Sequence, residues 1–225
     1  MFQFDGRFKQ IVSPRRKRTA LRINADGVLE VHTPPGVTEK EIRLLLAANE
    51  RVVTNLFKSF AARPPAVRYR FTPGEKFPFP GGELTLRITE RLALITETEL
   101  LLPAGTPEEM ALKAEQLYRR AALPLLKEKC RLLGAAHGLC PRSVGITGAK
   151  TRWGSCNSAG HISFCWKLLL LPEELADYIV CHELAHLRHL DHSPAFWALT
   201  EKLCPGAPAK RKRLQELPEL WNTPQ

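Results

Sequence analysis

The chain has 225 residues, of which 44% are hydrophobic and 25% charged, and its net charge is +10. This composition is that of an ordinary globular protein and excludes extensive disorder. The longest apolar runs, such as 168–171, are far shorter than the roughly 20 residues that cross a membrane. The first ten residues carry charges where a signal peptide has an apolar core, so we expect a cytoplasmic protein with no membrane partner.

The six cysteines contain no C-x-x-C pair, and a disulfide framework is not expected in a cytosolic chain of this length. The 33 Lys and Arg against 23 Asp and Glu attract polyanions, so nucleic acid or a nucleotide is a candidate partner of the basic surface. The basic runs at 15–18 and 210–213 are the candidate contacts, although such runs most often form solvated surface.

Strand patterns and one helix are predicted for the first hundred residues. Residues 17–23 and 27–32 are expected to pair as a hairpin. A capping box at Thr38 begins a helix that ends before Pro64. Strand patterns then return over 67–102.

Longer helices are predicted for the second half of the chain. A capping box at Thr106 begins a helix that reaches about Ala136, with a kink or break near Pro124. Strands over 144–151 and 161–168 flank a turn at 154–160.

Two further helices close the predicted fold. The first runs from Pro172 to about Leu190, and the second begins at the Ser193 cap and ends before Pro205. The residues after 205 form a polar tail that carries the second basic run.

The sequence His182-Glu183-Leu184-Ala185-His186 is an H-E-x-x-H motif within a predicted helix. Histidines four residues apart lie about 6 Å apart along one helix face, so both imidazoles can bind one metal ion. Glu183 lies about 100° further around the helix, where its carboxylate can reach a water molecule on that metal. The motif therefore predicts a Zn²⁺ site with Glu183 as the catalytic base.

A catalytic zinc site has a third protein ligand and one open position, and His189, Asp191 and His192 are the candidates. His189 lies about 10.5 Å along the helix axis from His182, which is too far for Zn–N bonds of about 2 Å. His192 is favoured, because the chain has to turn before Ser193 and can fold back over the metal. Asp191 is expected to orient a ligand imidazole instead.

These parts predict metal-assisted hydrolysis, most simply of a peptide bond. Zinc acidifies its bound water and polarises the carbonyl, and Glu183 takes the proton and passes it to the leaving amine. One alternative is a metal-dependent hydrolase of nucleoside triphosphates, of the pyrophosphatase type. The other is a nucleic-acid-associated protein with a structural metal. The sequence has no phosphate-binding loop motif, and structural zinc usually has four protein ligands, so the peptidase is favoured.

Several motifs occur in the order and spacing of a known family, and the chain resembles the YgjP-like metallopeptidases. The motifs are Arg152-Trp153-Gly154-Ser155-Cys156, Gly160-His161-Ile162, Leu171-Pro172, Asp177-Tyr178-Ile179-Val180, the H-E-x-x-H segment with Leu187, His192-Ser193 and Phe196-Trp197. Segments 16–18, 21–23 and 26–27 also fit the family's opening, so the resemblance covers nearly the whole chain to about Cys204. Cys165 stands where the family usually has Asn.

The resemblance implies an α+β fold, with a zincin-like metallopeptidase core behind an N-terminal β-rich extension. It also implies zinc ligation by His182, His186 and His192, with Glu183 as the catalytic acid/base. The family is more distantly similar to the SprT-like and WLM proteases, which act on proteins crosslinked to DNA. No substrate is carried over from that distant similarity.

We therefore expect three regions. They are a β-rich N-terminal region with one helix (1–104), a zincin-like catalytic region (105–205) and a basic polar tail (206–225).

The R-W-G-S-C segment is a candidate substrate-binding strand, because zincin-like folds bind extended peptide along the strand edge beside the metal helix. Trp153 can wall that cleft, and Arg152 can face a substrate carboxylate or phosphate. Phe196 and Trp197 are expected to be core residues that anchor the third ligand rather than substrate contacts.

Overall fold

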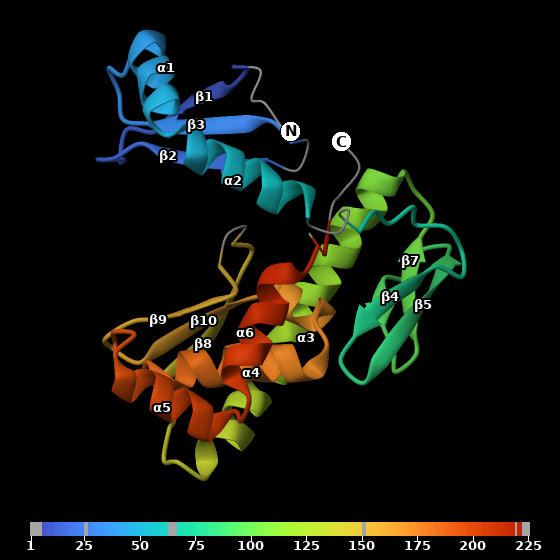
Figure 1. Cartoon of the computed structure of the whole chain (residues 1–225). Helices are drawn as coiled ribbons and strands as arrows, with labels where there is room; N and C mark the ends of the chain where they lie inside the picture. Colours follow the sequence, from blue (N-terminus) through green and yellow to red (C-terminus); the bar gives the residue numbers. More distant parts are fainter. Residues whose placement is uncertain (1–5, 25–26, 63–66, 150–151, 219, 222–225) are drawn as a thin grey trace. The chain divides into compact units, whose positions relative to one another are not determined.

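The computed structural model describes residues 6–24, 27–62, 67–149, 152–218 and 220–221. The chain forms two compact units, one from Met1–Ala66 with Leu217–Glu219 and one from Val67–Glu216 with Leu220–Gln225. Figure 1 labels their helices and strands.

Unit 1 contains a three-stranded sheet made of β1 (Lys9–Val12), β2 (Ala20–Ile23) and β3 (Leu29–Thr33). The order is β1-β3-β2, with β3 parallel to β1 and antiparallel to β2. The β2–β3 pair confirms the predicted hairpin, and the tip of its turn at 25–26 lies outside the described residues. Strand β1 was not predicted.

Two helices, α1 (Glu39–Ala48) and α2 (Glu50–Ala61), replace the single helix that was predicted. The Thr38 capping box begins α1 as expected. Asn49 interrupts the helix, because its backbone is not helical (φ −120°, ψ 29°) and its side-chain amide donates to the Leu45 carbonyl instead. The core of the unit comprises the buried residues Ile23, Leu29, Val31, Ile42, Leu46 and Val53.

Unit 2 begins with a four-stranded sheet. Its strands are β4 (Lys76–Phe79), β5 (Gly82–Thr89), β6 (Leu94–Ile95) and β7 (Glu99–Pro103), in the order β4-β5-β7-β6. The sequence grouped residues 67–104 with the N-terminal region, whereas the structure places them in the same compact unit as the H-E-x-x-H helix. The division into three regions by role stays a prediction.

Aromatic side chains join this sheet to the rest of unit 2. The Tyr118 hydroxyl donates to the Pro78 carbonyl at 2.8 Å. Neighbouring rings form one cluster of Tyr69, Phe71, Phe77, Phe79, Tyr118, Trp166 and Trp221. Most of these rings are buried, so the cluster is a core shared by the sheet and the long helix that carries Tyr118.

That long helix, α3 (Pro107–Ala135), begins at the predicted Thr106 capping box and continues through Pro124 without a break. Pro124 itself is exposed. Buried residues on either side of it, such as Ala122 and Leu126, hold the two halves of the helix against the core. Packing therefore outweighs the loss of one backbone hydrogen bond.

The third sheet lies beside the H-E-x-x-H helix. Its strands β8 (Ser143–Thr147), β9 (Gly154–Cys156) and β10 (His161–Cys165) are in the order β8-β10-β9, with β9 antiparallel to β10. Strand β9 occupies residues that were predicted as a turn. A buried 3-10 helix, η1 (Trp166–Leu170), then connects β10 to the next helix.

Helix α4 (Glu173–Ala185) carries the H-E-x-x-H motif and packs against α3, α5 (Pro194–Leu203), α6 (Ala207–Glu216) and β9. It ends five residues earlier than predicted, because short bonds such as Leu187 N to Leu184 O tighten the last turn. The tail also contains a helix, α6, whose first backbone N–H groups are capped by the Glu201 carboxylate.

The structure confirms the expected α+β class, with a β-rich N-terminal extension before the unit that carries the H-E-x-x-H helix. All six cysteines are free thiols. Within the described ranges, no helix combines the length and the apolar character needed to span a membrane.

Candidate metal centre and active site

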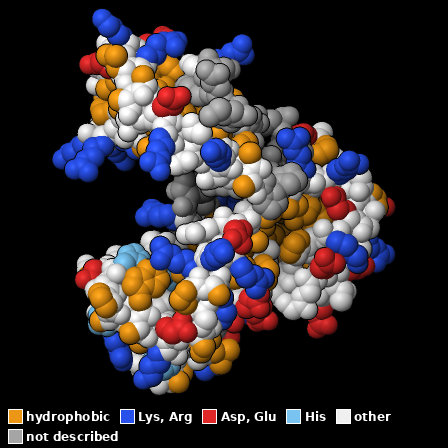
Figure 2. Space-filling model, in the orientation of Figure 1, with side chains coloured by type: hydrophobic (Ala, Val, Ile, Leu, Met, Phe, Trp, Pro, Cys, Tyr) orange, Lys and Arg blue, Asp and Glu red, His pale blue; other side chains and the backbone are white. Residues whose placement is uncertain are grey.

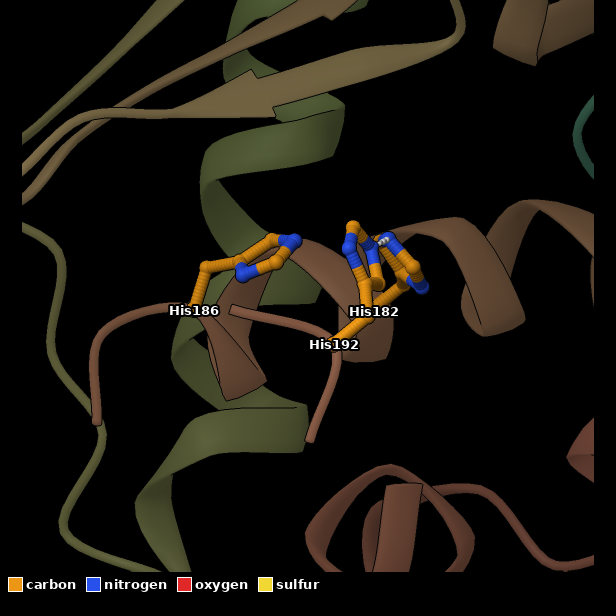
Figure 3. A group of neighbouring side chains, drawn as sticks. All are labelled: His182, His186 and His192. Atoms are coloured by element: carbon orange, nitrogen blue, oxygen red, sulfur yellow. Dashed lines mark hydrogen bonds between the residues drawn. The ribbon is translucent and has the colours of Figure 1, made fainter. Parts of the chain in front are cut away.

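The imidazoles of His182, His186 and His192 converge in unit 2, as Figure 3 shows. One ligand atom of each lies within 4.8 Å of the other two. The Nε2 atoms of His182 and His192 are 3.2 Å apart. Two nitrogens bound to one tetrahedral zinc ion at about 2.05 Å would be about 3.3 Å apart. The three residues therefore fit a single metal ion with an open fourth position.

The third histidine reaches this position because the chain turns sharply after α4. Ser193 caps α5 by accepting a hydrogen bond from Phe196 N at 3.4 Å, with Pro194 in the first turn, as the sequence predicts. The short loop between the two helices then carries His192 back over the face of α4 that bears His182.

The other two candidate ligands lie outside the convergent group. The backbone carbonyl of His189 is 2.9 Å from Nδ1 of His186, an arrangement that fixes the ring and leaves Nε2 for a metal. The Asp191 carboxylate accepts a hydrogen bond from Ser193 N. The orienting contact expected from Asp191 is therefore made at His186 by a backbone carbonyl.

Phe196 packs against all three histidine rings. Its ring stacks on His186 with centroids 4.4 Å apart, and it meets His182 and His192 edge-on at 4.9 and 4.8 Å. Phe196 is fully buried. It acts as the expected core anchor and restricts the rotamers of the three rings.

Trp197 covers the same group from another side, with its ring centroid 5.6 Å from His192 and 5.8 Å from His182. The Arg211 guanidinium lies over the Trp197 ring at 4.7 Å, which is a cation–π distance. A residue of α6 is thus connected to the metal centre through one aromatic ring. Arg211 could not be singled out from the sequence, because nothing in a run of four basic residues distinguishes it from its neighbours.

The rest of the 210–213 run is also engaged by the protein itself. Lys210 donates to Cys204 Sγ at 3.0 Å, and Arg213 pairs with Glu174 of α4. Three of the four basic side chains therefore hold α6 in place. On the face shown in Figure 2, other Lys and Arg side chains are spread over the surface with acidic side chains between them. Nucleic-acid binding stays a prediction without a structural observation in its favour.

Burial favours the neutral form of His182 and His186. It lowers the pKa of His182 to about 4, with a further contribution from the neighbouring His186 and His192. Burial also lowers the pKa of His186. Neutral imidazole is the form that binds a metal ion.

Glu183 is 5% exposed on α4, and its carboxyl group faces β9. Burial raises the pKa of Glu183 to about 7, and the positive charge of Arg152 acts in the opposite direction. A side-chain carbon at Gly154 would lie only 2.7 Å from both Cγ and Oε1 of Glu183. Glycine therefore occupies the position of the R-W-G-S-C segment at which β9 passes close to the Glu183 carboxyl group, where a larger residue would not fit.

The two predicted substrate-binding residues, Arg152 and Trp153, directly precede Gly154, the first residue of β9. Arg152 is exposed. Trp153 is partly buried, and its carbonyl accepts a hydrogen bond from Cys165 N at 2.7 Å. Cys165 is buried, so it occupies a core position where the family usually has Asn. The substrate contacts of Arg152 and Trp153 stay predictions.

A family profile described as "YgjP-like, metallopeptidase domain" matches residues 17–217. The chain belongs to the YgjP-like metallopeptidase family. Membership confirms the resemblance and supports a hydrolase that uses a metal ion and acts on peptides.

The chain is also similar to the metallopeptidase zymogen abylysin of Pyrococcus abyssi, with 29% sequence identity. That match covers 40% of this chain and 90% of the abylysin chain, with a TM-score of 0.37. A search of curated proteins returned no match.

Proposed function

We propose that this protein is a cytoplasmic zinc-dependent metallopeptidase in which His182, His186 and His192 hold the metal and Glu183 is the general base. The observation that carries the proposal is the convergence of three imidazoles on α4 and the loop after it, with the Glu183 carboxyl buried on the same helix. Six free cysteines are consistent with a reducing compartment.

The donor set favours zinc. Three imidazoles with one open position are typical of catalytic zinc sites, whereas magnesium and calcium prefer oxygen ligands. When bound, zinc would supply Lewis acidity that acidifies water and polarises the scissile carbonyl. Proton transfer and substrate positioning would be carried out by the protein itself.

Glu183 would take a proton from the attacking water and deliver it to the nitrogen of the leaving amine. A general base works best when its pKa is close to the working pH, and burial raises that of Glu183 to about 7. Gly154 leaves room for the carboxyl group beside β9. Packing on two sides would therefore fix Glu183 in one position throughout the reaction.

The substrate would lie along β9. This strand is the last in its sheet, so an extended peptide can add to it through backbone hydrogen bonds. Such a peptide would pass directly over Glu183, because β9 contacts that carboxyl group at Gly154. Trp153 and Arg152, which precede Gly154, would then contact substrate side chains.

Replacing Glu183 with Gln tests the proposal. We expect peptide hydrolysis by the zinc-loaded protein, measured on casein and on mixed synthetic peptides, to fall by about 10²- to 10⁴-fold in Glu183→Gln. The metal content should stay unchanged, because Glu183 is not a ligand. The control is Glu108→Gln, an exposed residue in the first turn of α3.

Full activity in Glu183→Gln with its metal retained would remove the general-base role. Hydrolysis of nucleoside triphosphates but not of peptides would instead assign the site to phosphoanhydrides.

A further inference from the structure

A small polar pocket lies beside the proposed catalytic carboxylate. Its volume is about 230 Å³, and Thr147, Ala149, Arg152, Gly154, Ser155 and Ser163 line it. This pocket contains one guanidinium group, three hydroxyl groups and no carboxylate.

The three hydroxyls come from neighbouring strands and lie on the same face of the sheet. Ser155 of β9 and Ser163 of β10 are register partners, so their side chains project to one side. Thr147 of β8 is the partner of Cys165, two residues after Ser163, and projects to that side as well. The opposite face carries the buried Ile162 and Phe164.

The charge of Arg152 is available to a ligand. Arg152 is exposed and forms no salt bridge within the part of the chain that the structure describes. The Thr147 hydroxyl already donates to the Phe164 carbonyl. The guanidinium group and the hydroxyls of Ser155 and Ser163 match an oxyanion, because a carboxylate or phosphate can accept hydrogen bonds from all three groups.

The pocket also lies where a substrate side chain would enter. Gly154 belongs both to the pocket and to the contact with Glu183. A peptide paired with β9 projects alternate side chains to opposite faces of the sheet. If one residue lies over α4, its neighbour projects towards the face that carries Ser155.

We infer that this pocket is a specificity subsite that binds an oxyanionic side chain of the peptide substrate, next to the residue over Glu183. This inference rests on the proposed peptidase function. The oxyanion is the carboxylate of Asp or Glu, or the phosphate of a phosphorylated Ser. Both groups are anionic hydrogen-bond acceptors, and the experiment below distinguishes between them.

The test uses zinc-loaded full-length protein and a synthetic peptide library in which each position is Glu, Gln, phosphoserine or Ser in turn. Cleavage is followed by mass spectrometry, and kcat/KM is measured for matched pairs. We expect about a 10-fold or greater preference for Glu over Gln at one position beside the scissile bond. The phosphoserine and Ser pair shows whether phosphate is bound as well.

Arg152→Gln should reduce the Glu to Gln ratio to near 1, and Ser155→Ala should reduce it in part. The ratio is compared within each variant, so any effect of Arg152 on Glu183 affects both peptides equally and cancels. The control is Arg120→Gln, an exposed arginine of α3, which should leave the ratio unchanged. Circular dichroism and metal content confirm that each variant is folded.

Cleavage without an acidic preference, or a preference that survives Arg152→Gln, would overturn the subsite and leave the peptidase function in place. No cleavage of any peptide by the zinc-loaded protein would overturn the proposed function and the subsite together.

Discussion

Gly154 shows how one absent side chain can shape a catalytic site. Strand β9 passes so close to Glu183 that a methyl group at this position would overlap the carboxyl group. The backbone of Gly154 needs no left-handed conformation, so glycine is required here for space rather than for its torsion angles.

We predict that Gly154→Ala displaces the Glu183 side chain, abolishes most peptide hydrolysis and lowers the free energy of unfolding by about 1 to 3 kcal/mol. Metal content should be retained, because the three histidines are untouched. The control is Gly145→Ala in β8, where the nearest atom to the added carbon is 3.7 Å away. Activity, thermal melting and elemental analysis test this. Equal activity in the two variants would contradict the role of Gly154.

We propose that Arg211 is a positioning residue that acts through Trp197 on the histidines. Without the guanidinium group, the Trp197 ring loses a cation–π contact and can move away from His192. We predict that Arg211→Ala weakens zinc binding by about 10-fold, measured by competition with a chelator of known affinity. Lys212→Ala, an exposed neighbour, should leave affinity unchanged. Similar affinities in the two variants would show that α6 does not support the site.

Much of the site could be predicted from residue spacing alone. The four-residue spacing placed His182 and His186 on one helix face, and the Ser193 cap placed a turn that brings His192 back. The contact between Gly154 and Glu183 could not be predicted, because it joins a strand and a helix far apart in the sequence. The carbonyl of His189 and the guanidinium of Arg211 also act through tertiary packing, which leaves no local pattern.

Helix α4 is tied to α3 by an ion network at the end opposite the metal centre. Lys129 of α3 lies 2.5 Å from the Asp177 carboxylate and 2.8 Å from that of Glu173, both on α4. Burial of the ammonium group disfavours its charge, but the hydrogen bonds to both carboxylates outweigh this effect, and the pKa of Lys129 is raised. The hydrogen bond and charge of Lys129 lower the pKa of Glu173.

We predict that Lys129→Met lowers the free energy of unfolding by about 1 kcal/mol at pH 7. The raised pKa of Lys129 means that its contribution is present below about pH 10.5 and is lost as the pH rises above it. The lowered pKa of Glu173 means that its contribution is present above about pH 4.5 and is lost as the pH falls.

Denaturant unfolding across that range, with the exposed Lys127→Met as the matched control, measures the effect. The two variants should differ most at neutral pH, and the difference should shrink as the pH falls below about 4.5 or rises above about 10.5. A difference that does not change with pH would mean that packing of the Lys129 stem, rather than its charge, is responsible.

Local sequence patterns predict where a helix begins more accurately than where it ends. The capping boxes at Thr38 and Thr106 and the Ser193 cap each begin a helix in the structure. The interruption at Asn49 was not predicted, although its cause is the local bond from the Asn49 side chain to the Leu45 carbonyl. The break expected near Pro124 is absent, because packing on both sides of Pro124 keeps the helix continuous. Strand β9 is only three residues long, too short for an alternating pattern to be recognised.

At the scale of the whole molecule, the proposed metal ligands and the proposed base all belong to unit 2. The fold class and the family follow from the sequence because motifs are distributed along most of the chain. The boundary between the units was not predicted, because strand patterns occur on both sides of the helix that ends before Pro64. The basic composition suggested a polyanion partner, but in the 210–213 run three side chains have partners within the protein.

The central claim is that His182, His186 and His192 together hold one metal ion. Elemental mass spectrometry of zinc-supplemented protein tests it directly, with His192→Ala and His189→Ala compared with the wild type. We predict about one zinc per chain in the wild type and in His189→Ala, and a large loss in His192→Ala. Zinc retained in His192→Ala, or lost only in His189→Ala, would contradict the proposed metal centre.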